Sequence, residues 1–161
     1  MRLTERLMNV VREAAVRGDS VEGLARACAV SAYVAFSPFV GMHTLMLLGI
    51  AWLFRLNFLV MLIFSNLINN PWTLVPIYAT GYACGQWLLA GLCGPAVLLS
   101  NPAWMVYINS VLGKMLGVGQ ISFWAFMLGG NLIGCIVACI VYPLARIGIM
   151  RAMSTYNTTN C

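Results

Sequence analysis

The chain has 161 residues, of which 61% are hydrophobic and only 8% are charged. Soluble domains usually carry about 25% charged residues, so a typical soluble globule is excluded. Disorder is excluded as well, because so much apolar surface cannot be left in water. The formal net charge is +5, and all four acidic residues lie within the first 22 positions. We therefore expect an all-α integral membrane protein, with membrane lipids and no nucleic acid as its partners.

Residues 1–22 predict an amphipathic helix at the cytoplasmic or interfacial side of the membrane. Apolar residues recur at helical spacing between Leu3 and Ala14, and arginines occupy the opposite face. Charges recur too often for the uninterrupted apolar stretch of a signal peptide. Asp19 with Glu22 resembles a capping box that opens the next helix. Two placements stay open: the helix lies on the membrane surface, or it docks onto the protein's own cytoplasmic side.

Residues 23–152 form the expected membrane domain, and its first apolar block is interrupted. Pro38 and Gly41 break this block, because a proline in a helix interior costs about 3 kcal/mol. The apolar helix that follows, over residues 43–54, is about 18 Å long at 1.5 Å per residue, which is too short to span the bilayer. We expect it to be half of a broken helix or a re-entrant arm.

The same pattern recurs in the next block. A polar turn over residues 54–57 precedes a short apolar helix over residues 58–68. Asn70 is a favoured helix cap and Pro71 suits the first helical position, so a new helix is expected from Pro71 to Ala90. Two short apolar segments, both interrupted by proline or glycine, are typical of discontinuous helices that meet at a binding site.

The remaining blocks are more regular. Residues 103–116 predict a helix of modest hydrophobicity, and residues 121–150 predict a full membrane span. Gly81 and Gly85 have the spacing that permits close contact between helices. Residues 153–161 form a polar tail. Arginines precede the first span and close the last one, so we expect a small polytopic bundle with both termini in the cytoplasm.

Three motifs carry a family resemblance. They are P-F-x-G-x-H-T, R-L-N and N-P-x-T-x-x-P-x-Y, formed by Pro38, Phe39, Gly41, His43, Thr44, Arg55, Leu56, Asn57, Asn70, Pro71, Thr73, Pro76 and Tyr78, with Gly81 and Gly85 following. The chain thereby resembles a prokaryotic membrane family known as domain of unknown function 2062. The resemblance implies a multi-pass protein of the bacterial cytoplasmic membrane. Many members of that family have Gln at the position of His43, which does not favour an obligatory acid or base there.

The sequence lacks the residues that several classes of enzyme require. No carboxylate follows Glu22, so the membrane domain has no paired acids, no proton relay and no acidic cation site. P-loop, HExxH and GxSxG motifs are missing. The cysteines form no CxxC pair and the single histidine supplies few ligands, so neither a metal nor another cofactor is expected. His43 and Thr44 point about 100° apart on a helix, with no third group to orient them, so no catalytic residue is assigned and an enzyme is disfavoured.

The polar residues around the two breaks predict an anion site. A helix N-terminus offers free N–H groups and about half a positive charge, and such starts follow both breaks. Arg55 has no acid nearby in the sequence to pair with. The expected ligand is an anionic lipid or lipid-linked phosphate, which the protein binds and translocates. The expected ligand-binding residues are Gly41, His43, Thr44, Arg55, Asn57, Asn66, Asn70 and Thr73.

Each of these residues also has a purely structural interpretation. The asparagines can satisfy backbone groups that the breaks set free. His43 can be a hydrogen-bonded core residue, and Arg55 can extend to the membrane interface. The alternative function is therefore a non-transporting membrane scaffold or assembly factor, in which the breaks only shape the fold. A homo-oligomer is compatible with either function.

Overall fold

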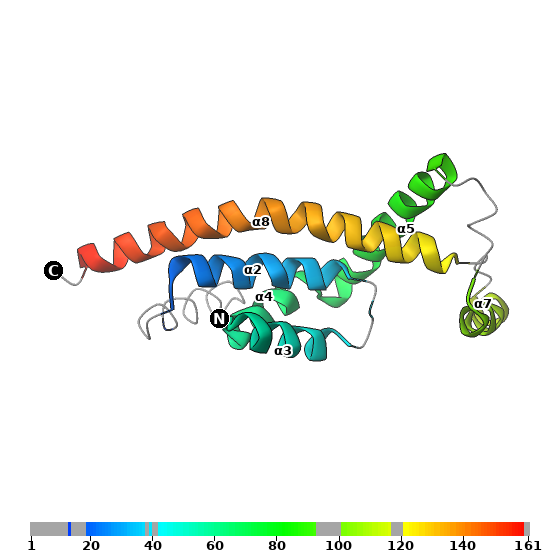
Figure 1. Ribbon diagram of the computed structural model, residues 1–161, viewed down its shortest axis with the longest axis horizontal. Helices are drawn as coiled ribbons and strands as arrows, with labels where there is room; N and C mark the ends of the chain where they lie inside the picture. The colour runs from blue at the N-terminus through cyan, green and yellow to red at the C-terminus, as the bar shows by residue number, and fades with distance from the viewer. Residues whose placement is uncertain are drawn as a thin grey trace.

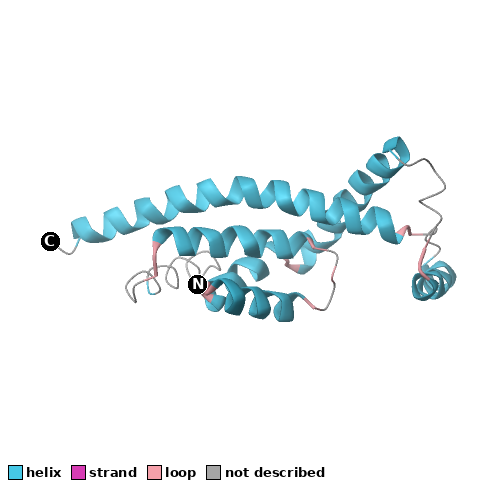
Figure 2. Cartoon of the chain, in the orientation of Figure 1, coloured by secondary structure: helices cyan, strands magenta, loops and turns pink. Residues whose placement is uncertain are grey.

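The computed structural model describes residue 13 and residues 19–37, 39, 42–92, 101–116 and 121–159. This part of the chain is all-helical, as predicted, and contains no strand (Figure 2). Its helices are α2 (Val21–Phe36), α3 (His43–Phe54), α4 (Phe58–Ile68), α5 (Pro71–Leu92), α7 (Ala103–Leu116) and α8 (Phe123–Thr159). Most of the predicted helix over residues 1–22, and both Pro38 and Gly41, lie outside the described residues.

The helix α8 forms the long axis of the molecule, and α2 packs along it (Figure 1). The Tyr33 hydroxyl of α2 donates to Asn131 Oδ1 of α8 at 2.5 Å. The two helices come close there, since a Cβ added at Gly134 would lie only 3.1 Å from Tyr33. Four alanines of α2 are also fully buried, namely Ala25, Ala27, Ala32 and Ala35.

The helices α3 and α4 form a hairpin against α2, at the bounds that the sequence predicts (Figure 1). Leu47 and Met61 from the hairpin are buried in one cluster with Leu24 of α2. The tip of the hairpin is held to the start of α2, because Asn57 Nδ2 donates to Asp19 Oδ2 at 2.8 Å. The hairpin therefore returns to the end of the molecule where α2 begins.

The turn at the tip places Arg55 in the left-handed region, with φ 52° and ψ 41°. Residues with a Cβ pay about 1–2 kcal/mol for this conformation, whereas glycine adopts it freely. We expect Arg55→Gly to unfold at the same temperature as the wild type or a higher one, and Arg55→Ala to gain nothing. Thermal unfolding in detergent compares the two variants. A glycine variant less stable than the alanine variant would show that contacts of the guanidinium, rather than the backbone, set this turn.

The structure confirms both predicted breaks. One break separates α2 from α3, and α5 leaves α4 at an angle of 83° at the other. Pro71 is the first residue of α5, as predicted, and the helix runs to Leu92, slightly beyond the predicted end at Ala90. The close contact expected at Gly81 and Gly85 is also confirmed, because α5 crosses α8 at these two residues.

The predicted capping box at the start of α2 is wrong. Ser20 is the cap, and its Oγ accepts a first-turn backbone N–H at 3.0 Å. Glu22 instead contacts α8, where its carboxylate lies 3.1 Å from Arg146 Nη2 and accepts the Tyr142 hydroxyl at 3.1 Å. Asp19 likewise accepts from the hairpin rather than from its own helix. Both carboxylates are used for tertiary contacts because partners of complementary charge and polarity lie within reach.

The helix α8 continues through Thr159, so most of the predicted polar tail is helical. By length and composition, the segment Phe123–Ser154 of α8 could cross a membrane. The helices α4 and α5 would provide a second membrane crossing if together they form one broken span. Among the described residues, α8 is therefore the one clear candidate for a membrane-spanning helix.

Candidate functional site

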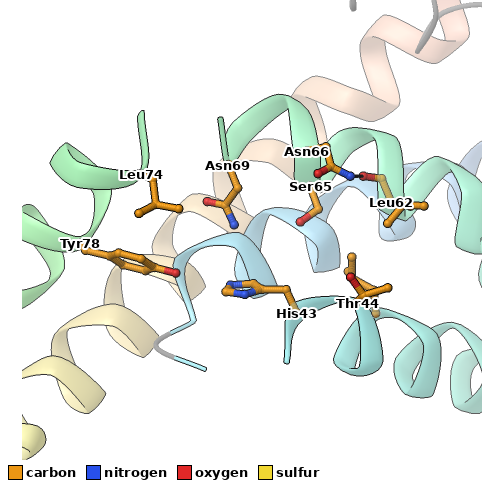
Figure 3. Close-up of a pocket in the computed structure, with 9 residues that line it drawn as sticks. His43, Thr44, Leu62, Ser65, Asn66, Asn69, Leu74 and Tyr78 are labelled. Carbon is orange, nitrogen blue, oxygen red and sulfur yellow. Dashed lines mark hydrogen bonds between the residues drawn. The ribbon is translucent and has the colours of Figure 1, made fainter. Parts of the chain in front are cut away.

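A pocket of about 200 Å³ lies among α3, α4 and α5, where the two breaks meet (Figure 3). His43 stands directly after the first break and Asn69 directly at the second. The side chain of His43 points across the pocket towards Tyr78 (Figure 3). The described residues that line it are His43, Thr44 and Leu47 of α3, Leu62, Ser65, Asn66 and Asn69 of α4 and its C-terminal end, and Leu74 and Tyr78 of α5.

The pocket gathers polar atoms that have no hydrogen-bond partner. Among the described residues, four buried side-chain atoms lack a partner, and three of them belong to the pocket lining: His43 Nε2, Asn69 Oδ1 and the Tyr78 hydroxyl. The fourth is Ser37 Oγ at the end of α2. Buried polar groups are nearly always paired, because an unpaired one costs about 1–3 kcal/mol. Three such atoms around one pocket are the arrangement expected of a site that a ligand completes.

The start of α3 lies at this pocket. Met42 occupies the cap position of α3 and makes no side-chain capping bond. His43 and Thr44, the first two residues of the helix, both line the pocket. An uncapped helix start exposes N–H groups and carries about half a positive charge, which attracts anions.

The start of α5, in contrast, is closed by its own residues. Asn70 Oδ1 accepts from the N–H groups of Trp72 at 2.8 Å and Thr73 at 3.3 Å. Thr73 Oγ1 accepts from the N–H of Asn70 at 3.1 Å and donates to the carbonyl of Ile68. Neither Asn70 nor Thr73 lines the pocket. Their polar groups satisfy the backbone at the break.

The other predicted site residues are divided between the pocket and the hairpin tip. Asn66 lines the pocket, while its Nδ2 donates to the carbonyl of Leu62 at 2.8 Å. Asn57 caps α4, with its Oδ1 accepting two first-turn N–H groups at 3.1 and 3.2 Å. Arg55 lies at the far end of α3 from His43, about 18 Å away along a helix of 12 residues. The structure therefore brings His43, Thr44 and Asn66 together and leaves Arg55 and Asn57 apart from them.

Three polar residues of the pocket were missed in the sequence: Ser65, Asn69 and Tyr78. Ser65 and Asn69 are four residues apart and therefore lie on the same face of α4. This spacing is a sequence signal that could have identified them. Tyr78 ends the N-P-x-T-x-x-P-x-Y motif, which was a signal as well. Its position beside α3, however, depends on the angle between α4 and α5.

Loss of either asparagine cap is expected to destabilise the protein. Replacing such a cap by alanine costs about 0.5–2 kcal/mol. We expect Asn70→Ala and Asn57→Ala to unfold at lower temperature, and Asn57→Ala to lose more because it also loses the bond to Asp19. Asn70→Asp keeps the accepting oxygen and is the matched control. Equal unfolding temperatures for Asn70→Ala and Asn70→Asp would contradict a capping role.

Comparison with known proteins identifies the family. Residues 6–156 match the family described as an uncharacterized protein conserved in bacteria (DUF2062). No curated protein and no solved structure matches the chain. The match extends well beyond the three motifs on both sides and confirms the resemblance seen in them. The chain therefore belongs to the bacterial family DUF2062.

Proposed function

We propose that this protein is a small polytopic protein of the bacterial cytoplasmic membrane that binds and translocates an anionic lipid or lipid-linked phosphate. The binding site is the pocket between α3, α4 and α5. The observation that carries the proposal is that three residues lining this pocket carry buried polar atoms without a partner, beside a helix start that has no side-chain cap. A scaffold whose breaks only shaped the fold would have no need of unpaired polar atoms that cost stability.

Exposed apolar side chains support insertion into a membrane. On α8 they recur every four residues and form a stripe that winds around the helix: Leu128, Leu132, Ile136, Ile140 and Leu144. On α3, Leu45, Leu48 and Trp52 are likewise exposed, the last at 80%. Contiguous apolar surface of this extent is not tolerated in water, whereas lipid chains solvate it. The short α3, which cannot span alone, is then a re-entrant arm.

Charged groups support the proposed orientation. Glu22, Arg26 and Arg146 lie together where α2 begins and α8 approaches its end. The hairpin tip with Arg55 returns to the same end through the bond between Asn57 and Asp19. Lys and Arg concentrate on the cytoplasmic side of membrane proteins. We therefore place this end, and both termini, in the cytoplasm.

The chemistry of the pocket favours phosphate over ammonium headgroups. Its polar lining consists of hydroxyl, amide and imidazole groups, and no carboxylate occurs among the described residues that line it. Hydroxyl groups and free N–H groups at the start of α3 can donate to phosphate oxygens. An ammonium group would find no negative partner. A volume of about 200 Å³ holds a headgroup, while the acyl chains would stay outside in lipid.

The binding test compares His43→Ala with Leu45→Ala, an exposed position on the same helix outside the pocket. Native mass spectrometry measures phosphatidylglycerol and phosphatidylethanolamine bound to the detergent-purified protein. We expect phosphatidylglycerol to bind more tightly, and His43→Ala to weaken it about threefold to tenfold, the value of one hydrogen bond. Leu45→Ala should bind like the wild type. Unchanged binding by a folded His43→Ala variant would contradict the proposal.

Translocation is tested separately in vesicles that contain fluorescent phosphatidylglycerol. The protein should speed the movement of this lipid between leaflets relative to vesicles without protein, and His43→Ala should slow it. Binding without accelerated movement would favour the alternative, a non-transporting scaffold that holds a lipid.

A further inference from the structure

The helix α7 is fastened across the start of α8. Asn109 pairs with both backbone groups of Ile121, donating to its carbonyl at 2.9 Å and accepting from its N–H at 3.2 Å. Asn101 Oδ1 accepts from the N–H of Phe123 at 2.7 Å. The Trp104 ring packs edge-on against Phe123, with centroids 5.1 Å apart. These contacts fix the direction of α7, and Figure 1 shows it end-on while α8 runs lengthwise.

The side chains of α7 suit a membrane interface. The helix has 14 residues, so it is about 21 Å long and too short to cross a hydrocarbon core of about 30 Å. Asn109 faces the backbone of Ile121 and Met105 is buried, whereas Trp104 and Tyr107 are 55% and 72% exposed. Trp and Tyr concentrate at membrane–water interfaces, and helices with one apolar face lie in that plane.

The length of α8 places α7 at the interface opposite the charged end. Arg146, paired with Glu22, stands where we place the cytoplasmic interface. From Arg146 to Phe123 the helix measures about 35 Å at 1.5 Å per residue, close to the thickness of the hydrocarbon core. A helix fixed crosswise at Phe123 is therefore at the depth of the other interface.

The pocket lies between the middle of α8 and this end, because α2, which ends just before the pocket, meets α8 at Gly134. Tyr78 packs edge-on against Phe126, one turn from the start of α8, with centroids 5.4 Å apart. Tyr82, one turn further along α5, accepts from the N–H of Ser122 at 3.2 Å. One wall of the pocket is thus about one helical turn below α7.

We infer that α7 lies in the outer interface of the membrane and anchors the start of α8 there. The inference rests on the proposed function for the orientation of the bundle. It adds an anchoring role for α7, which rests on that helix's own contacts.

The depth of α7 is measured with tryptophan fluorescence in phosphatidylcholine vesicles whose chains carry bromine at different depths. Trp104 is kept as the only tryptophan, with Phe at positions 52, 72, 87 and 124. The matched control has Phe at all five positions and Ile136→Trp, an exposed site in the middle of α8. We expect shallow bromines to quench Trp104 most and deep bromines to quench Ile136→Trp most.

The outcomes separate the two proposals. A Trp104 as deep as Ile136→Trp overturns the inference and leaves the membrane span intact. An Ile136→Trp that no bromine quenches rejects the span itself, and with it the proposed function.

The side of the membrane is determined with single-cysteine variants in a background without native cysteines. Tyr107→Cys in α7 and Arg55→Cys at the hairpin tip are both at exposed positions. In spheroplasts, a membrane-impermeant maleimide should label Tyr107→Cys from outside and Arg55→Cys only after permeabilisation. Any other pattern of labelling overturns the assignment of α7 to the outer interface.

Discussion

The substitution Gly85→Ala is expected to force α5 away from α8 and to destabilise the protein more than an alanine at Gly81 or Gly91 does. An added Cβ would lie 1.8 Å from the carbonyl oxygen of Ala125 and 2.6 Å from its carbonyl carbon. Both are backbone atoms, so no change of rotamer relieves the overlap. Overpacking in a closely packed interior costs about 1–3 kcal/mol, and moving a helix backbone places this case at the upper end.

The neighbouring glycines provide matched controls on the same helix. At Gly81, one turn earlier, a Cβ would lie 3.5 Å from the backbone of Gly130, which is an ordinary contact. At Gly91 it would meet nothing within 4 Å. We expect Gly81→Ala to be nearly neutral and Gly91→Ala to gain up to about 1 kcal/mol from helix propensity. Thermal unfolding in detergent and the yield of monodisperse protein measure all three variants.

The same substitution is expected to disturb the pocket, because α5 carries Tyr78. Gly129→Ala repeats the clash from the other helix, with its Cβ 1.8 Å from the carbonyl oxygen of Gly81. Both variants should therefore lose phosphatidylglycerol binding together with stability. A Gly85→Ala protein as stable as Gly91→Ala would show that the two helices do not cross in this manner.

Local signals explain why the helix bounds were predictable. Two asparagines precede α5 and Pro71 is its first residue, and the Arg–Leu–Asn turn separates α3 from α4. Such residues act through neighbours within one turn of the chain, so they can be recognised without the fold. The bounds of α3, α4 and α7 are therefore those that the sequence predicts.

The roles of individual polar residues were less predictable, because the same side chain can serve a cap or a ligand. Asn57 and Asn70 bind helix starts, while Asn69, adjacent to Asn70, has an unpaired oxygen in the pocket. At the start of α2, the pattern Asp19–Glu22 satisfies the capping rule as well as Ser20 does. The contact of Glu22 with Tyr142, 120 residues away in the sequence, decides against it. A pattern of neighbouring residues cannot reveal a contact between residues so far apart in the sequence.

The two tyrosines of α5 should respond in opposite directions to the loss of their hydroxyl group. The Tyr78 hydroxyl is buried in the pocket without a partner. The Tyr82 hydroxyl, one turn along the same helix, accepts from Gln86 Nε2 at 3.0 Å and from the N–H of Ser122 at 3.2 Å. In the protein without ligand, Tyr78→Phe removes a desolvation cost of about 1–3 kcal/mol, whereas Tyr82→Phe removes hydrogen bonds worth about 0.5–1.5 kcal/mol each.

We therefore expect Tyr78→Phe to unfold at a higher temperature than the wild type and Tyr82→Phe at a lower one. Added phosphatidylglycerol should raise the unfolding temperature of the wild type and of Tyr82→Phe, because a ligand that binds only the folded state stabilises it. It should raise that of Tyr78→Phe much less. Thermal unfolding of the three proteins, with and without the lipid, measures both effects.

A polar residue kept for binding lowers the stability of the free protein, and its ligand restores that stability. Replacing such a residue should therefore raise the unfolding temperature without lipid and reduce the increase that phosphatidylglycerol causes. If Tyr78→Phe is destabilised without lipid, the hydroxyl has a partner within the fold and the pocket is a packing defect. If Tyr78→Phe is stabilised but responds to phosphatidylglycerol like the wild type, the lipid binds elsewhere. The pair of isosteric changes on one helix thus separates a binding group from a structural one without altering the shape of the pocket.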